Sequence, residues 1–375
     1  MEENQGVTSG DLIMSKLQAD GGMIVHSDEP LNAEPVSSAL VANFYTPQNL
    51  FYIRNHGEIP QLANDHLVEL SGLVKTPASF CLADLQRDFS HRKVTAVLQC
   101  AGNRRADLQK VRKTSGDPWL VGAIGNAEWT GAALSDVLNK AQIDHSRANY
   151  VAFNCADEVD VDGETAAYGV SITLERATAG DVLIAWALNG EPLTPEHGAP
   201  MRIIVPDQAG VRSAKWIEKI EVRETPSTAP IQAKDYKLFP PSVAKDEAEW
   251  DEGLTIERMP VSSAICVPGP NEQIRSGKTT IKGYAVAYGR AVARVDVSAD
   301  GGNTWDQADL QSEPDALAAW TLWSLDIDLP AGKHELVVKA VDEAGQSQPE
   351  KMDDIWNFSG YLATAWHRVA VEAID

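Results

Sequence analysis

Apolar positions between about residues 65 and 225 follow two periods, one typical of strands and one typical of helices. The predicted strands are residues 66–73, 93–99, 182–188 and 201–205, and the predicted helices are residues 82–89 and 131–141. Thr130 is the predicted N-cap of the second helix, and Asn189-Gly190 predicts a tight turn. Because strands and helices do not alternate regularly, we expect a mixed α+β domain rather than a doubly wound sheet.

The pattern changes after residue 225. Residues 226–252 contain four prolines and few strand signals, which is typical of a linker. Helix signals then vanish, and short strands rich in Val, Ala, Trp and Ile are predicted at residues 279–287, 291–298, 320–329 and 333–341. Glycine-containing turns separate these strands, and their spacing favours an all-β sandwich of immunoglobulin type.

These patterns predict four parts. They are an N-terminal extension at residues 1–40 with one short helix at 11–17, an α+β domain at 41–230, a linker at 231–252 and an immunoglobulin-like domain at 253–375.

Composition restricts the partners of the chain. Its 375 residues carry 32 Lys and Arg against 54 Asp and Glu, a formal net charge of −22. We expect no nucleic acid and no anionic membrane as a partner, because phosphate binding needs a cationic face. An anionic substrate would need cations gathered locally.

No secretory signal, no apolar run of the ~18 residues that span a bilayer and no peroxisomal ending is found, so we expect a cytoplasmic protein. The four cysteines, Cys81, Cys100, Cys155 and Cys266, form no CxxC pair. This spacing favours free thiols over a zinc ribbon or a thioredoxin-type site.

The segment Leu98-Gln-Cys-Ala-Gly-Asn-Arg-Arg105 carries the most reactive combination of side chains in the chain. A thiol ends an apolar strand, a glycine permits a sharp turn, and guanidinium groups nearby favour the thiolate, which binds soft metals or acts as a nucleophile. A buried cysteine beside a surface arginine pair is the simpler alternative. A cysteine-protease site would need a histidine base, and no local signature supports His56, His66, His91 or His197 in that role. Zinc is less favoured, since no HxxxH or HExxH pattern occurs.

This segment resembles the molybdenum-binding signature of the sulfite oxidase family. Further matching segments follow the family's order over roughly residues 40–372, and they include Asn43-Phe-Tyr-Thr-Pro, Ile53-Arg-Asn-His56, Trp119, Trp129-Thr-Gly131, His197-Gly-Ala-Pro200, Val211-Arg-Ser-Ala-Lys-Trp216, Asp235-Tyr-Lys-Leu-Phe-Pro240, Gly289-Arg290, Asp300-Gly-Gly302 and Ala365-Trp-His-Arg368. The resemblance implies a molybdopterin-binding α+β domain followed by an immunoglobulin-like dimerisation domain.

The resemblance also implies roles for individual residues. Cys100 would be the thiolate ligand of molybdenum, whose other ligands come from the molybdopterin and oxo groups. The pocket residues that it implies are Arg54, Arg105, Arg290, Trp119 and Tyr236, and the residues that would hold the pterin and its phosphate are His56, Asp157, His197, Arg212, Ser213 and Lys215. Arginines suit this task independently, because guanidinium groups bind compact oxyanions such as sulfite in a bidentate manner.

The implied activity is oxidation of sulfite to sulfate, with two electrons passed to oxygen or to a separate protein such as a cytochrome c. The chain shows no HPGG or CxxCH haem signature, so we expect no haem in it. The resemblance also implies a homodimer that forms through the C-terminal sandwich. The alternatives are a nitrate reductase-type enzyme and a sulfoxide reductase-type enzyme. Arg290 argues against the first, because a resemblance to nitrate reductases would imply lysine at that position. The C-terminal sandwich argues against the second. A non-enzymatic two-domain binding protein is a further alternative, and Cys100 beside Arg105 would be unnecessary in it.

Overall fold

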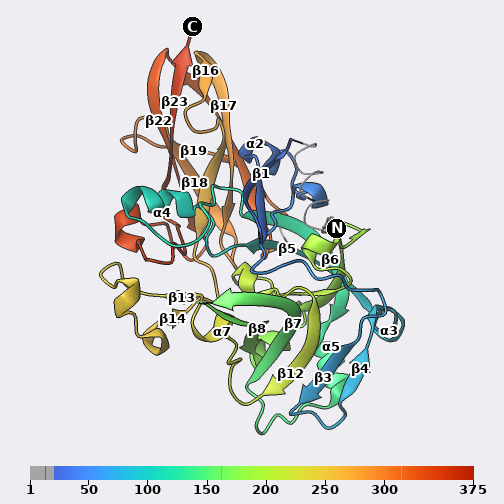
Figure 1. The fold of residues 1–375 in the computed structure, drawn as a ribbon. Coiled ribbons are helices and arrows are strands. Elements are labelled where there is room, and N and C mark those ends of the chain that lie inside the picture. Colours follow the sequence, from blue (N-terminus) through green and yellow to red (C-terminus); the bar gives the residue numbers. More distant parts are fainter. Residues whose placement is uncertain (1–12, 14–20, 162, 314) are drawn as a thin grey trace, which may run out of the picture.

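The computed structural model describes residues 13, 21–161, 163–313 and 315–375, in an α+β half and a mostly β half (Figure 1). The helix predicted at residues 11–17 lies outside the described residues except for Ile13. Within the described part of the chain, no helix is both long and apolar enough to cross a membrane.

Two five-stranded sheets form most of the α+β half. In one sheet the order is β10-β9-β6-β5 with β11 paired to β9, and in the other it is β4-β3-β12-β7-β8. The strands are β3 (Val68–Gly72), β4 (Ala78–Phe80), β5 (His91–Gln99), β6 (Ile124–Ala133), β7 (Tyr150–Val161), β8 (Glu164–Thr173), β9 (Leu183–Leu188), β10 (Glu191–Pro192), β11 (Arg202–Ile204) and β12 (Ile217–Arg223). The mixed α+β prediction and all four strands predicted in this half are therefore confirmed, and no strand end differs from its predicted position by more than two residues.

Short helices connect these strands. They are α2 (Ser37–Leu40), η1 (Gln48–Leu50), α3 (Leu82–Asp88), α4 (Arg105–Val111), α5 (Leu134–Ala141), α6 (Leu174–Ala177), η2 (Pro195–His197) and η3 (Gly210–Arg212). Helix α3 confirms the predicted helix at residues 82–89.

The second predicted helix begins three residues later than expected. Thr130 and Gly131 lie in β6, helix α5 starts at Leu134, and Ala133 occupies the N-cap, so the prediction of Thr130 as N-cap is wrong. A Cβ on Gly131 would lie 2.4 Å from the carbonyl oxygen of Ile184, so the glycine permits close pairing of β6 with β9. Strand pairing therefore overrides the helical spacing there.

The predicted linker is a packed segment. It contains α7 (Pro230–Ala233), β13 (Lys237–Leu238), η4 (Lys245–Glu247) and η5 (Trp250–Glu252), and β13 pairs with β14 (Leu254–Thr255). Ile231, Tyr236 and Phe239 are buried, so much of this segment contributes to the core rather than lying free between the halves.

Two sheets that share one apolar core form the C-terminal half. Their orders are β15-β17-β21-β20 and β16-β23-β22-β18-β19, and the core contains Ile281 and Trp323 from the first sheet and Val295 and Leu336 from the second. The strands are β15 (Ser262–Val267), β16 (Gln273–Arg275), β17 (Gly277–Val286), β18 (Val292–Ser298), β19 (Asp306–Gln307), β20 (Asp309–Gln311), β21 (Thr321–Leu329), β22 (Gly332–Asp342) and β23 (His367–Ile374), with η6 (Met352–Ile355) between the last two. The mostly β prediction is confirmed, whereas immunoglobulin-type topology stays a prediction.

The N-terminal part contains a hairpin that the sequence pattern did not predict. It consists of β1 (Met23–Asp28) and β2 (Leu31–Pro35), and every residue of β2 is buried. Ala33 pairs with Ile53 through two backbone hydrogen bonds, which ties the hairpin to the segment that carries Arg54.

Candidate functional site

The reactive thiol lies where an apolar strand meets a helix. The last four residues of β5 are buried, and the Cys100 N–H donates to the Ala123 carbonyl, which places Cys100 directly after the strand. The Gly102 N–H then donates to the Cys100 sulfur at 3.4 Å, so the sulfur accepts a backbone hydrogen bond within its own turn. A Cβ at Gly102 would lie 2.3 Å from the Arg105 guanidinium, so a larger residue in this turn would have to displace that group.

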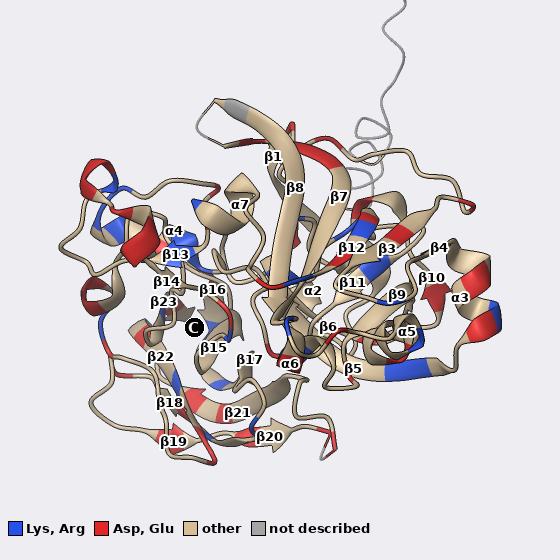
Figure 2. Cartoon of the chain, turned by 90° about the horizontal axis from the view of Figure 1, so that it is seen from below, with Lys and Arg blue, Asp and Glu red and all other residues tan. Residues whose placement is uncertain are grey.

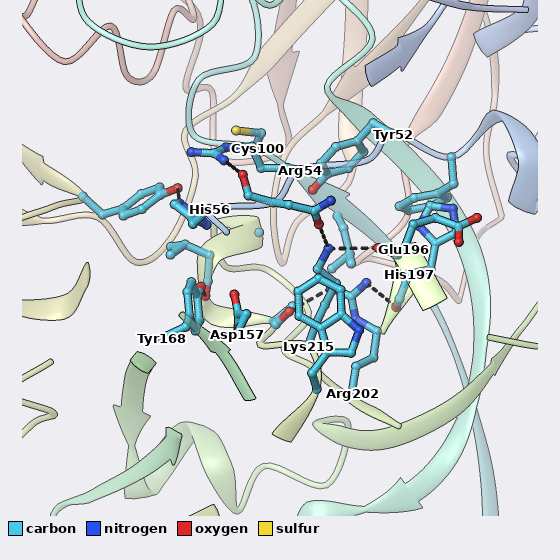
Figure 3. Close-up of a pocket in the computed structure, with 18 residues that line it drawn as sticks. Tyr52, Arg54, His56, Cys100, Asp157, Tyr168, Glu196, His197, Arg202 and Lys215 are labelled. Carbon is cyan, nitrogen blue, oxygen red and sulfur yellow. Dashed lines mark hydrogen bonds between the residues drawn. The ribbon is translucent and has the colours of Figure 1, made fainter. Parts of the chain in front are cut away.

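Cys100 opens into a pocket with an empty volume of about 610 Å³ (Figure 3). The side chains come from the segment 51–56, the end of β5, strands β7 and β8, the segment 196–216, and the segment after α7. The lining residues are Phe51, Tyr52, Arg54, Asn55, His56, Leu98, Cys100, Asp157, Tyr168, Glu196, His197, Arg202, Gly210, Val211, Ser213, Lys215, Trp216 and Tyr236.

His56 and Tyr236 form a hydrogen-bonded pair in this pocket. The Tyr236 hydroxyl and His56 Nε2 are 2.8 Å apart. Burial, with help from the Arg54 charge, holds the pKa of His56 well below its ordinary value, and burial raises the pKa of the Tyr236 phenol. At neutral pH the pocket therefore contains a neutral imidazole and a protonated phenol beside the Arg54 guanidinium.

A second group of polar side chains in the pocket is strongly cationic. Arg202 donates to the carbonyls of His197 and Ser213 at 3.0 and 2.8 Å, and Lys215 donates to the Glu196 carbonyl at 2.9 Å and to the Asn55 side chain. Burial lowers the pKa of Arg202 to about 10 and places the pKa of Lys215 well below its usual range, an effect to which the Arg202 charge adds. Two buried cations that repel each other would be stabilised by a bound anion.

Two buried polar atoms in this group have no partner among the described residues, namely Arg202 Nε and Asp157 Oδ1. Burial raises the pKa of Asp157 to about 6. Asp157 lies in an interruption of the β7–β8 ladder, where pairing passes from Asn154–Gly169 to Glu158–Ala167. Residues 155–157 of β7 face the single residue Tyr168 of β8 there, and this bulge turns Asp157 toward the pocket.

His197 and Ser213 also line the pocket and have hydrogen bonds of their own. His197 Nε2 donates to the Gln48 carbonyl at 3.0 Å, and burial lowers the pKa of His197 to about 4. The Ser213 hydroxyl accepts the Val205 N–H at 2.9 Å. The structure thus brings together eight of the twelve predicted site residues: Arg54, His56, Cys100, Asp157, His197, Ser213, Lys215 and Tyr236.

Three predicted residues, Arg105, Trp119 and Arg212, lie behind the pocket wall. Arg105 donates to the carbonyls of Asp117 at 2.9 Å and Gly360 at 3.2 Å, and its charge helps to lower the pKa of His56. Trp119 is fully buried in the same apolar cluster as Cys100. Arg212 is buried and donates to the Ile256 carbonyl at 2.9 Å.

Arg290 is not brought to the pocket. It lies between β17 and β18, where its Nε donates to Asp342 at 2.6 Å and its Nη2 donates to Gln346 at 2.7 Å. The predicted place of Arg290 in the pocket is therefore corrected, because its guanidinium is committed to a buried carboxylate.

Sequence reasoning also missed several lining residues, among them Tyr52, Asn55, Tyr168, Glu196 and Arg202. Arg202 gave one usable signal, since a charged residue within the apolar run 201–205 needs a polar environment. Tyr236 and Trp216 both have positive φ, at 53° and 54°, and for such bulky residues this backbone conformation often marks a functional site.

The donor set fits a metal that arrives with its own organic ligand. Among the described residues, no group of three or more His, Cys, Asp or Glu side chains is placed to hold a metal ion. A soft metal at the Cys100 sulfur would need further ligands from a non-protein group. The cations Arg202 and Lys215 would suit a phosphate on that group.

Comparison with known proteins gives two family models that cover most of the chain. The model described as "Oxidoreductase molybdopterin binding domain" matches residues 56–231, and the model described as "Mo-co oxidoreductase dimerisation domain" matches residues 254–374.

Individual proteins match over nearly the whole chain. Sulfite oxidase of Arabidopsis thaliana is 42% identical over an alignment of 368 residues, and the match covers 92% of this chain and 92% of that protein. Mitochondrial sulfite oxidase of Homo sapiens is 43% identical over 359 residues, and the match spans 65% of its length. The crystal structure of the sulfane dehydrogenase SoxCD from Paracoccus pantotrophus superposes with a TM-score of 0.80 at 25% identity, covering 95% of this chain and 90% of that one.

Proposed function

We propose that this chain, which belongs to the sulfite oxidase family, oxidises sulfite to sulfate at the pocket beside Cys100. The matches to the two family models and to the plant sulfite oxidase confirm the family resemblance found in the sequence motifs. The observation that carries the proposed activity is the convergence of the Cys100 thiol, the Arg54 guanidinium and the His56–Tyr236 pair on one pocket.

The chain is a molybdenum-cofactor protein, as its molybdopterin binding domain indicates. Cys100 would bind the metal, and Arg202, Lys215 and His197 would hold the anionic part of the pterin. The bound cofactor would supply the oxo group and accept the two electrons. Arg212 is a less direct candidate for pterin binding, because its guanidinium faces the Ile256 carbonyl and Gln232.

The protein residues would bind and orient the oxyanion. Arg54 lies in the pocket and Arg105 directly behind its wall, so both charges would act on sulfite in a partly desolvated site, where fixed charges are most effective. The protonated Tyr236 hydroxyl can donate a hydrogen bond to a sulfite or sulfate oxygen. Neutral His56 can hold that hydroxyl in place or take part in proton movement through it.

The remaining assignments extend this proposal. We propose that two copies associate through residues 254–374, in keeping with the description of the matching dimerisation domain, and that residues 41–230 form the catalytic domain. We also propose that the half with two sheets has immunoglobulin-like topology. Electrons would pass to oxygen or to a separate acceptor protein, for which a basic cytochrome c is our candidate.

A sulfite oxidation assay run in parallel with ferricyanide, oxygen and cytochrome c tests substrate and acceptor together. The protein should contain about one molybdenum per chain and reduce at least one acceptor only when sulfite is present. Nitrate and a methyl sulfoxide serve as competing substrates with a chemical reductant. Turnover of either one without sulfite oxidation would overturn the proposal, as would molybdenum-free protein from a host that makes the cofactor.

A further inference from the structure

A fully buried carboxylate lies outside both segments that the family models match. Glu34 is in β2 and is 0% exposed. Its carboxylate accepts the N–H groups of Leu120 at 2.6 Å and Gly122 at 2.5 Å, and it lies 2.6 Å from His26 Nε2 on the facing strand. Hydrogen bonds from backbone N–H groups to a buried carboxylate are strong, and an unsatisfied carboxylate there would be very unfavourable.

The loop that Glu34 holds connects α4 to β6 and also supports the reactive segment. Arg104 N–H donates to the Leu120 carbonyl at 2.7 Å, and Ala106 N–H donates to the Trp119 carbonyl at 3.1 Å. One residue past Gly122, the Ala123 carbonyl accepts the Cys100 N–H at 2.9 Å. The backbone around Cys100 and the start of α4 therefore rest on the loop that is bonded to Glu34.

A second link joins the same hairpin to both arginine-bearing segments. The Asn32 side chain donates to Asp117 at 3.0 Å and accepts the Asn55 N–H at 2.7 Å. Asn55 follows Arg54, and the Asp117 carbonyl accepts Arg105 Nη1 at 2.9 Å. The hairpin thus sets the relative position of the two guanidinium groups.

The sequence of the loop is adapted to the carboxylate. A Cβ at Gly122 would lie 2.9 Å from Glu34 Oε2 and 2.8 Å from the Pro35 carbonyl oxygen, so a side chain there would displace the carboxylate. The His26 ring also meets the Trp119 ring edge-on, with centroids 4.9 Å apart. These contacts of Glu34 therefore join the hairpin to the loop.

We propose that Glu34 is a positioning residue that holds the loop 117–122, and through it Arg105 and the Cys100 turn, in the arrangement that binds sulfite. The kinetic part of this inference rests on the proposed function. Its structural part can be measured in the cofactor-free chain.

Glu34→Gln is the test, with Glu29→Gln in the exposed turn of the same hairpin as the matched control. In cofactor-free protein, we expect the amides of Leu120 and Gly122 to exchange with deuterium at least tenfold faster in Glu34→Gln than in the wild type or the control. In cofactor-loaded protein, we expect the sulfite KM to rise at least fivefold, with kcat changed less than KM and with unchanged molybdenum content.

Gly122→Ala provides a second route if Glu34→Gln does not fold, because it displaces the same carboxylate from the loop side. It should produce the same two changes. Unchanged amide exchange would overturn the proposal that Glu34 holds the loop. Faster exchange with an unchanged sulfite KM would overturn its role in positioning the site and leave Glu34 a purely structural residue. A wild-type protein that does not oxidise sulfite would refute the proposed function, and the exchange measurement would still decide whether Glu34 holds the loop.

Discussion

Single side chains carry the substrate assignment, and Arg54 is the one most directly tested. It is the predicted pocket arginine that the structure places in the pocket lining beside Cys100. Arg54→Gln keeps a polar side chain but removes the charge that would bind the oxyanion. We expect the sulfite KM to rise at least tenfold with unchanged molybdenum content, as measured by steady-state kinetics and metal analysis. Normal KM in this variant would contradict the assignment.

Arg290→Met is the matched comparison, because the sequence resemblance and the structure lead to opposite expectations for it. The Arg290 side chain is 27% exposed, and its partner Asp342 is 0% exposed. Among the described residues, removing the guanidinium leaves Asp342 with only its backbone N–H donors, which should cost about 1–3 kcal/mol. We therefore expect a lower Tm and an unchanged sulfite KM, and a strong rise in KM would restore Arg290 to the substrate site.

The ligand role of Cys100 gives a second prediction. Cys100→Ser keeps the shape of the turn but replaces a soft sulfur by a hard hydroxyl oxygen, which is a poor substitute as a molybdenum ligand. We expect turnover to fall at least a thousandfold while the protein stays folded. Cys81→Ser is the control, since Cys81 caps α3 away from the pocket and serine also caps helices well. An active Cys100→Ser variant would exclude the ligand role.

At this scale, local sequence patterns could predict only those site residues that lie within one contiguous motif. Cys100 was predictable because an apolar strand, a thiol and a glycine turn follow one another within a few residues. Tyr52, Tyr168 and Arg202 reach the same pocket from separate strands and loops, so no local pattern relates them. Arg290 shows the opposite error, since a matching motif did not reveal that Asp342 holds its side chain.

At the scale of elements, the turn at residues 357–362 supports the site from the C-terminal half. The Leu362 N–H donates to the Ala101 carbonyl at 2.8 Å, and the Tyr361 ring stacks on Tyr236 with centroids 5.1 Å apart. Arg105 donates to the Gly360 carbonyl of this turn. The turn therefore contacts the segment after Cys100, the pocket tyrosine and the arginine behind the pocket.

Gly360→Ala should disturb this contact. Gly360 has φ +66°, and a Cβ there would lie 2.6 Å from Arg105 Cγ. Gly345→Ala is a matched control in the same half, because Gly345 has φ +77° but no atom within 4 Å of the added Cβ. Both substitutions should destabilise by about 1 kcal/mol through backbone strain. Only Gly360→Ala should also raise the sulfite KM. An equal KM in the two variants would show that the turn does not support the site.

Element boundaries failed where a tertiary contact competed with a local pattern. The helical spacing of residues 131–141 is real, but Gly131 and its neighbours pair with β9 before the helix can start. The hairpin β1–β2 was missed for a related reason. Its burial depends on partners such as Leu120 and Asn55 that lie far along the chain, and its own apolar pattern is short.

At the scale of the whole molecule, two adjacent arginines diverge to join the halves. Arg105 faces the 357–362 turn, whereas Arg104 donates to the Ala365 carbonyl at 2.8 Å and to Asp107 at 3.0 Å. His367 lies at this junction, where its Nδ1 accepts the Ile265 N–H at 3.0 Å. Burial, with the Arg104 charge, lowers the pKa of His367 to about 3, so the folded state keeps this histidine neutral.

The pH dependence of stability follows from that lowered pKa. Between the unfolded-state pKa of about 6.5 and about 3, the unfolded chain binds a proton that the folded chain does not, so stability falls as the pH falls. His367→Asn keeps an acceptor for Ile265 without a titrating ring. Between pH 6.5 and 5, the free energy of unfolding measured in urea should fall in both proteins. We expect the fall in His367→Asn to be smaller than in the wild type by about 1–2 kcal/mol. A matched substitution at the exposed His145 is the control, and an unchanged slope in His367→Asn would refute the role.

The net charge of −22 yields a prediction about electron acceptors that no single residue determines. Acidic residues are spread over both halves of the ribbon and outnumber basic ones (Figure 2), so the overall field should attract a basic acceptor and repel an anionic one. Charges separated by more than about 10 Å are screened at 0.1 M salt. Raising the ionic strength should therefore slow sulfite-dependent reduction of cytochrome c and speed reduction of ferricyanide, because the first acceptor is a cation and the second an anion. Since sulfite is common to both assays, its own response to salt cancels in the ratio of the two rates. A ratio that does not change between about 0.01 and 0.2 M salt would exclude electrostatic docking of the acceptor on this surface.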